Sequence, residues 1–128
     1  MEYVAGILTA LCIAIFSRML KLDNRRSFYS TVLIVIAIFY VLFAIIGGEV
    51  KWIVAETIVA LLFAGLAIIS RNMPMLVVGV GLIAHGLYDA QHDQLLETRG
   101  VPQWWPAYCA TVDILLGIWV LYLGRLQR

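Results

Sequence analysis

Acidic and imidazole side chains interrupt the apolar stretches of this chain at five positions: Glu56, His85, Asp89, His92 and Asp113. At about 100° per residue, His85, Asp89 and His92 fall within roughly 60° of one another on one face of a helix. An ionisable group at the centre of a membrane span costs on the order of 2.5–3.5 kcal/mol, and such groups usually serve a function. We therefore expect these five side chains, which come from three separate helices, to meet in one site.

Two kinds of chemistry suit this set of side chains. Imidazole and carboxylate groups together bind a borderline or hard divalent cation, with zinc as the leading expectation, and the predicted ligands are His85, Asp89, His92 and Asp113. The alternative is general acid-base chemistry, in which one carboxyl group keeps its proton while a neighbour stays charged. In that interpretation the catalytic residues are Glu56, His85, Asp89 and Asp113, with Glu56 as proton donor or fourth ligand and His92 at the mouth.

Aromatic and sulfur side chains lie close to these positions along the sequence. Cys109 lies four residues before Asp113 and shares its helix face, and Trp105 lies one turn further out. The residues expected to line a pocket around the site are Trp52, Tyr88, Trp105 and Cys109.

Structural interpretations of the same residues stay open. His92 is alternatively a solvated loop residue, and Asp89 alternatively caps a helix end or binds Arg99. Glu56 and Asp113 alternatively pair with His85 as polar links between helices, which contribute about 0.6 kcal/mol each on average.

The amino-acid composition indicates whether water or lipid surrounds the helices that carry these residues. Of 128 residues, 63% are hydrophobic and 13% are charged, against roughly 45–50% and 25% in an ordinary soluble domain. The formal net charge of +1 gives no basic surplus for a nucleic acid and no acidic tail. Cys12 and Cys109 are far apart with no CxxC spacing, which excludes a disulfide scaffold and a zinc finger. The sequence therefore predicts a membrane protein that does not bind nucleic acid.

Five apolar segments have about the length that a bilayer core of about 30 Å requires. They predict an all-α bundle of five transmembrane helices in one domain, residues 1–128, and the expected spans are 3–20, 28–47, 50–70, 73–91 and 105–124. Only the connection from Asp93 to Trp104 has any length. Since Glu2 precedes the first apolar run and the basic residues follow it, we expect this helix to stay in the protein rather than act as a signal peptide.

The positions of the basic residues predict the orientation. With the amino terminus outside and the carboxyl terminus cytoplasmic, the residues on the cytoplasmic side are Arg18, Lys21, Arg25, Arg26, Arg71, Arg125 and Arg128. Only Lys51 and Arg99 then face outward, so we expect a multi-pass protein of the cell membrane. The aromatic residues expected in an outer interfacial belt are Tyr3, Trp52, Tyr88, Trp104, Trp105 and Tyr108, and those expected near the inner face are Tyr29 and Tyr122.

The carboxyl-terminal third of the chain carries two distinctive segments, HGLYD from His85 and PQWWPAYCATVD ending at Asp113. Over residues 85–123, the sequence resembles a family of small bacterial multi-pass membrane proteins of unknown function. The resemblance implies no activity, and it adds weight to the positions of His85, Asp89, Cys109 and Asp113.

These observations favour an outward-facing polar pocket for metal-assisted or acid-base chemistry on a lipophilic substrate. One alternative is a proton- or cation-coupled transporter or channel subunit, and another is a non-catalytic accessory or assembly subunit of a membrane complex. The expected partners are the lipid bilayer, a lipophilic small molecule and further copies of the chain in a homo-oligomer.

Overall fold

The computed structural model describes residues 1–21, 26–95 and 100–126, which form five α-helices and no strand. The helices are α1 (Glu2–Met19), α2 (Arg26–Gly47), α3 (Val50–Ser70), α4 (Met75–Leu95) and α5 (Trp105–Leu126). The all-α prediction is confirmed, and most helix ends lie within two residues of the expected ones. Arg25, Arg99 and Arg128, which entered the predicted orientation, lie outside the described residues.

The expected end of the fourth helix at Gln91 is wrong, because α4 continues to Leu95. His92, in the last turn of this helix, is buried and contacts Glu56 of α3. The buried contact between His92 and Glu56 stabilises the polar last turn of this helix. As a result His85 lies at the middle of α4, about 15 Å along the axis from each end, rather than near its outer end.

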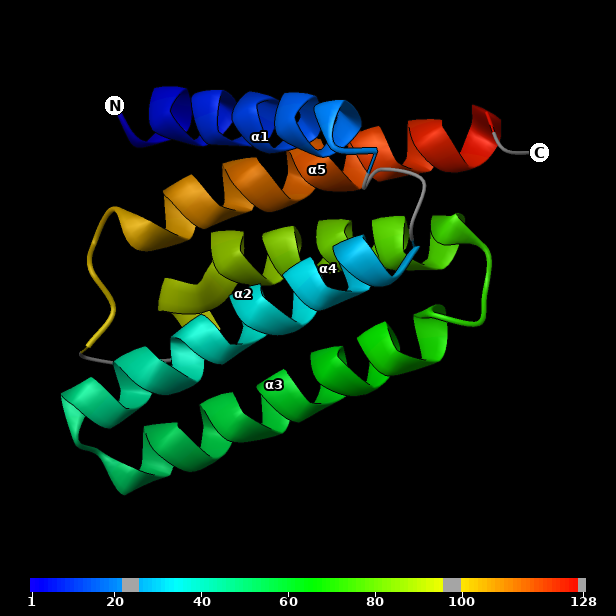
Figure 1. The fold of residues 1–128 in the computed structure, drawn as a ribbon. Helices are drawn as coiled ribbons and strands as arrows, with labels where there is room; N and C mark the ends of the chain where they lie inside the picture. Colours follow the sequence, from blue (N-terminus) through cyan, green and yellow to red (C-terminus); the bar gives the residue numbers. More distant parts are fainter. Residues whose placement is uncertain (22–25, 96–99, 127–128) are drawn as a thin grey trace.

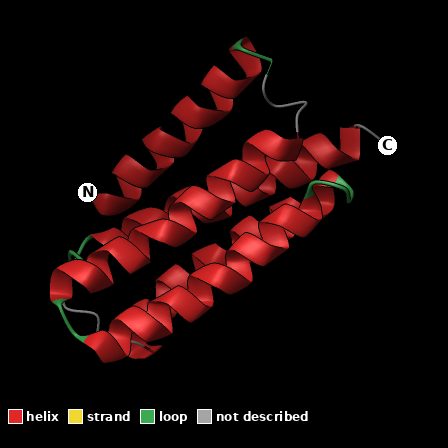
Figure 2. Ribbon diagram, turned by 60° about the horizontal axis from the view of Figure 1, so that its bottom comes forward, coloured by secondary structure: helices red, strands yellow, loops and turns green. Residues whose placement is uncertain are grey.

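The helices lie side by side and alternate in direction, so that the two termini are at opposite ends of the bundle (Figure 1). Helix α4 is central, since it packs against α5, α2 and α3. Helix α1 packs mainly on α5 and stands apart from α3 in the second view (Figure 2). The polar side chains of His85, Asp89 and His92 on α4 are therefore buried against its neighbouring helices.

Four helical segments are long and apolar enough to cross a membrane: Glu2–Met19, Ser27–Gly47, Val50–Ser70 and Trp105–Leu126. Among the described residues α4 does not join them, and it is the helix that carries His85, Asp89 and His92. Large apolar side chains such as Leu8, Leu61 and Ile68 cover much of the outside of the bundle. An apolar exterior around a polar centre is typical of a membrane protein.

Glycines set the close approach of α4 and α5. A Cβ added to Gly117 would lie 2.9 Å from the carbonyl oxygen of Gly79, and one added to Gly86 would lie 2.6 Å from the Cγ1 atom of Ile114. Small residues allow the backbones of membrane helices to approach in this way. Gly79, Gly86 and Gly117 thus permit the close packing that brings His85 next to α5.

An apolar layer fills the middle of the bundle beside the site. Leu33 of α2, Leu82 of α4 and Leu116 of α5 are at most 1% exposed and belong to one hydrophobic cluster. Nearer the other end, the hydroxyl of Tyr29 contacts Ser17 Oγ at 3.0 Å and accepts a hydrogen bond from Trp119 Nε1 at 3.1 Å. Tyr29, in the first turn of α2, is therefore a buried link between α1, α2 and α5.

Candidate functional site

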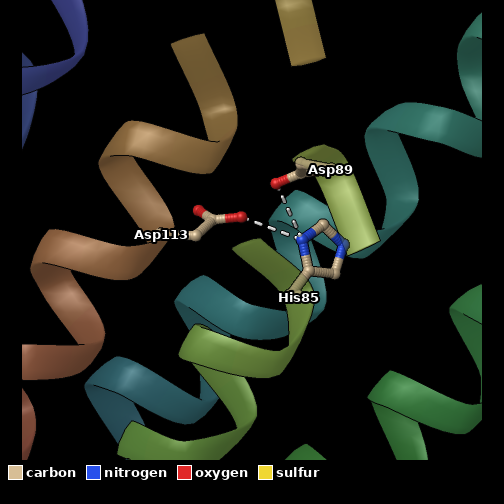
Figure 3. Close-up of side chains that lie close together, drawn as sticks. All are labelled: His85, Asp89 and Asp113. Atoms are coloured by element: carbon tan, nitrogen blue, oxygen red, sulfur yellow. Dashed lines mark hydrogen bonds and ion pairs between the residues drawn. The ribbon is translucent and has the colours of Figure 1, made fainter. Parts of the chain in front are cut away.

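The first cluster of the candidate site joins α4 to α5. The Nδ1 atom of His85 lies 2.8 Å from Asp113 Oδ2 and 3.3 Å from Asp89 Oδ2, so that one ring nitrogen faces two carboxylates (Figure 3). Asp89 follows His85 by one helical turn, which puts both side chains on the same face. All three side chains are at most 1% exposed. The predicted meeting of His85, Asp89 and Asp113 is thus present in the structure.

Several oxygens of this cluster have no hydrogen-bond partner among the described residues. Both carboxylate oxygens of Asp89 and Oδ1 of Asp113 are buried and receive no hydrogen bond. A buried polar atom left without a partner costs about 1–3 kcal/mol, and more if it is charged. A proton, a water molecule or a bound cation would each give these oxygens a partner.

The second cluster joins α3 to α4 through the two carboxylate oxygens of Glu56. Glu56 Oε1 lies 2.5 Å from His92 Nε2, and Glu56 Oε2 accepts a hydrogen bond of 2.8 Å from the Tyr88 hydroxyl. Glu56 and His92 are both 1% exposed. His92 is therefore neither a loop residue nor at an open mouth, and it pairs with Glu56 rather than joining His85, Asp89 and Asp113.

Aromatic rings occupy the space between the two clusters. The ring of Tyr40, on α2, is stacked on His92 with centroids 4.2 Å apart and lies 6.2 Å from the ring of His85. Tyr88 packs edge-on against both imidazoles, and Phe63 of α3 packs edge-on against His85. The two clusters therefore share one continuous aromatic wall.

The expected pocket residues have different surroundings. Tyr88 points inward to Glu56, so its expected place in the outer aromatic belt is wrong and its expected place beside the site is right. Cys109 is a free, buried thiol one turn from Asp113. Trp105 packs against Phe39 and Phe43 of α2, and Trp52 lies next to Lys51 at the start of α3. Of the four, Tyr88 and Cys109 lie closest to the clusters in the fold.

The charges of the site are not balanced by fixed cations. Three carboxylic acids and two histidines lie within the bundle, whereas the basic side chains that the structure describes are all exposed: Arg18, Lys21, Lys51, Arg71 and Arg125. Even with both imidazoles protonated, three carboxylates would leave a net charge of −1. Clustered carboxylates in a low dielectric require either a proton or a bound cation.

Tyr40 is a residue of the site that the sequence analysis missed. A tyrosine in an apolar span is commonly assigned to the core or to an interface, and nothing polar adjoins it in the sequence. A signal was nevertheless present in the pattern of the second helix, where Leu33, Ala37, Tyr40 and Ala44 recur at helical spacing and are all buried. The small alanines mark the inward face and would have pointed Tyr40 at the other helices.

The comparisons with known proteins gave one match. A family model described as a family of unknown function, DUF6010, matches residues 1–126. No curated protein and no solved structure matches the chain. The resemblance seen in the last third of the sequence therefore extends over nearly the whole chain.

Proposed function

Because the chain belongs to DUF6010, a family of unknown function, we propose its function from its own residues. The protein is an integral membrane protein that binds a divalent cation at His85, Asp89 and Asp113 and uses it, together with Glu56 and His92, for acid-base chemistry on a lipophilic substrate. Two facts are established: four helices are long and apolar enough to span a membrane, and the family has no assigned function. The bound cation and the reaction are the proposal.

The observation that carries the proposal is the set of orphaned carboxylate oxygens beside His85 Nδ1. The ligand atoms of His85, Asp89 and Asp113 lie within 4.8 Å of one another. Both Asp89 oxygens and one Asp113 oxygen are buried without a hydrogen bond. A single imidazole N–H can donate to only one of the two carboxylates, so a cation would satisfy the remaining acceptors and the excess negative charge together.

The donor set fits zinc after a small adjustment. Bonds of about 2.0–2.2 Å around a tetrahedral zinc ion place its ligand atoms about 3.3–3.6 Å apart. The separation of 3.3 Å between His85 Nδ1 and Asp89 Oδ2 meets this condition, whereas the 2.8 Å to Asp113 Oδ2 is a hydrogen-bond distance and must lengthen by about 0.5 Å. Three protein ligands leave a fourth position open, as in catalytic zinc sites.

The second cluster supplies an acid-base pair next to this centre. Glu56 orients the His92 ring through Nε2 and is itself fixed by the hydroxyl of Tyr88. A carboxylate that holds an imidazole in one orientation is the usual arrangement of a histidine that transfers protons. When bound, the cation would polarise an oxygen of the substrate, and His92 would accept or return the proton.

The membrane placement follows from the same interpretation. Helix α4 serves as a fifth span, since α2, α3 and α5 surround it and shield its polar residues from lipid. The amino terminus then lies outside and the site faces the outer half of the cell membrane, in agreement with the excess of basic residues predicted on the cytoplasmic side. A substrate that enters from the outer leaflet requires the helices to separate locally, because the clusters are enclosed.

A transport function is less well supported by the arrangement of the core. An ion that left His85 toward the carboxyl-terminal end of the bundle would meet the buried side chains of Leu33, Leu82 and Leu116. This layer has no polar group to replace water around an ion, so it opposes conduction through the monomer. An assembly role without chemistry would leave the orphaned oxygens unexplained.

Elemental analysis of protein purified in mild detergent tests the proposal. We expect about one equivalent of a divalent metal, with zinc the leading candidate, and a loss of at least tenfold in zinc affinity in His85→Gln, Asp89→Asn and Asp113→Asn. Glu2→Gln is the matched control, because this carboxylate lies at the start of α1 and pairs with the amino terminus, away from both clusters. Metal-free protein that stays metal-free after incubation with zinc would overturn the cation site.

A separate experiment tests the acid-base roles of Glu56 and His92. Glu56→Gln and His92→Gln leave the three proposed ligands in place, so we expect them to keep the metal. Turnover of lipophilic ester or amide probes by the zinc-loaded protein should fall at least a hundredfold in both variants. Equal turnover in the wild-type protein and in both variants would exclude the assigned roles.

A further inference from the structure

Tyr40 is placed where the two clusters meet. It lies on α2, which contributes no carboxylate or imidazole to either cluster, and it is 2% exposed. Its ring is stacked on His92 and lies close to the rings of His85 and Tyr88. It therefore contacts both the proposed cation site and the proposed acid-base pair.

The hydroxyl of Tyr40 is a buried donor that needs an acceptor. It has no hydrogen-bond partner of ordinary geometry within the described part of the chain, and it interacts electrostatically with the Asp89 carboxylate. Both oxygens of Asp89 in turn lack a hydrogen-bond donor. An unsatisfied donor and two unsatisfied acceptors, all enclosed by the same helices, are complementary, and pairing them removes a cost on both sides.

We infer that the Tyr40 hydroxyl holds Asp89 in place by donating a hydrogen bond to it, directly or through one bound water molecule. Tyr40 is then a positioning residue: Asp89 keeps one oxygen for the cation, and the tyrosine occupies the other. Groups that orient a ligating carboxylate commonly affect metal affinity 10–100-fold. The link between this hydrogen bond and the cation rests on the proposed function. The hydrogen bond itself is independent of that function.

The decisive variant is Tyr40→Phe, which removes one oxygen and keeps the ring against His92. We expect its zinc affinity, measured by competition with a chromophoric chelator in detergent, to fall 10–100-fold. The visible absorption of bound Co²⁺, used as a spectroscopic probe, should change as well. Tyr122→Phe is the control, since this tyrosine is 52% exposed near the other end of α5.

A second measurement needs no metal. The chain has two histidines, so the ¹⁵N spectrum of chelator-treated, histidine-labelled protein contains four ring nitrogens, which His85→Gln and His92→Gln assign. If Tyr40 holds Asp89, its loss frees that carboxylate to compete for His85 Nδ1, and the His85 signal moves in Tyr40→Phe and stays unchanged in Tyr122→Phe.

The two measurements separate the possible failures. If the wild-type protein binds no zinc and the His85 signal moves in Tyr40→Phe, the cation site is contradicted and the hydrogen bond between Tyr40 and Asp89 is supported. If zinc binds equally tightly to the wild-type protein and to Tyr40→Phe, and the His85 signal does not move, the role of Tyr40 is contradicted and the cation site is supported.

Discussion

Glu56 of α3 and His92 of α4, 36 residues apart in the sequence, form a buried pair with their Oε1 and Nε2 atoms 2.5 Å apart. Together with the hydrogen bond from the Tyr88 hydroxyl to Glu56 Oε2, the pair links these two helices through polar side chains. It fixes the rotation of α3 about its axis and thereby decides which of its faces meets the site.

This pair should be strongly coupled. Removing one member leaves the other buried without its partner, so we expect Glu56→Ala to lower the free energy of unfolding by about 3 kcal/mol. Adding His92→Leu should cost much less than its effect in the wild-type protein. The free energies of unfolding of the wild type, the two single variants and the double variant form a double-mutant cycle. They are measured in mixed micelles of mild detergent and sodium dodecyl sulfate, with Glu2→Ala as a surface control. Strictly additive effects would contradict the pairing.

The glycine contact between α4 and α5 should be required for the site. In Gly117→Ala the new methyl group meets the carbonyl oxygen of Gly79 and the side chain of Ile83, so the helices must separate. We expect a loss of about 2 kcal/mol in stability and weaker zinc binding, because His85 and Asp113 move apart.

A matched glycine variant checks that the effect comes from packing. A Cβ on Gly65 of α3 would meet no atom within 4 Å. Gly65→Ala should therefore leave zinc binding unchanged and raise helix stability by about 0.5–1 kcal/mol. If Gly117→Ala behaved like Gly65→Ala, the close approach of α4 and α5 would not be what positions the site.

The hydroxyl of Tyr29 should anchor α1 to the rest of the bundle. It contacts Ser17 Oγ and accepts a hydrogen bond from Trp119 Nε1, and both of these groups lose that partner in Tyr29→Phe. We expect a loss of about 1–2 kcal/mol and faster proteolysis between α1 and α2. Thr31→Ala is a suitable control, because this exposed hydroxyl donates to the backbone carbonyl of Ser27 in its own helix. Unchanged proteolysis would argue against the anchor.

The orientation can be tested with single cysteines. Cys12 and Cys109 are the only native thiols, so a Cys12→Ser, Cys109→Ala background accepts a probe at either end. Glu2→Cys should react with a membrane-impermeant maleimide in intact cells, whereas Arg125→Cys should react only after permeabilisation. The reverse pattern would place the site near the cytoplasmic face.

Helix number and the membrane environment could be read from the sequence because they depend on local properties. Apolar runs of the right length determine the spans, and the boundaries of α2, α3 and α5 agree with that criterion. The end of α4 could not be found in this way. Its last turn is polar and is held by the burial of His92, which is a tertiary effect.

Part of the site was also predictable. Helical spacing put His85 and Asp89 on one face, and the expected approach of Asp113 from another helix is present in the structure. The division into two clusters was not predictable, because it depends on how α3 is rotated and on which imidazole reaches Glu56. Tyr40 was missed since its role depends on the space between clusters rather than on its neighbours in sequence.

The leucine layer beside the site has a physiological consequence. An ion that moved from Asp89 into this layer would exchange its polar ligands for hydrocarbon. The layer thus opposes a leak of ions through the bundle.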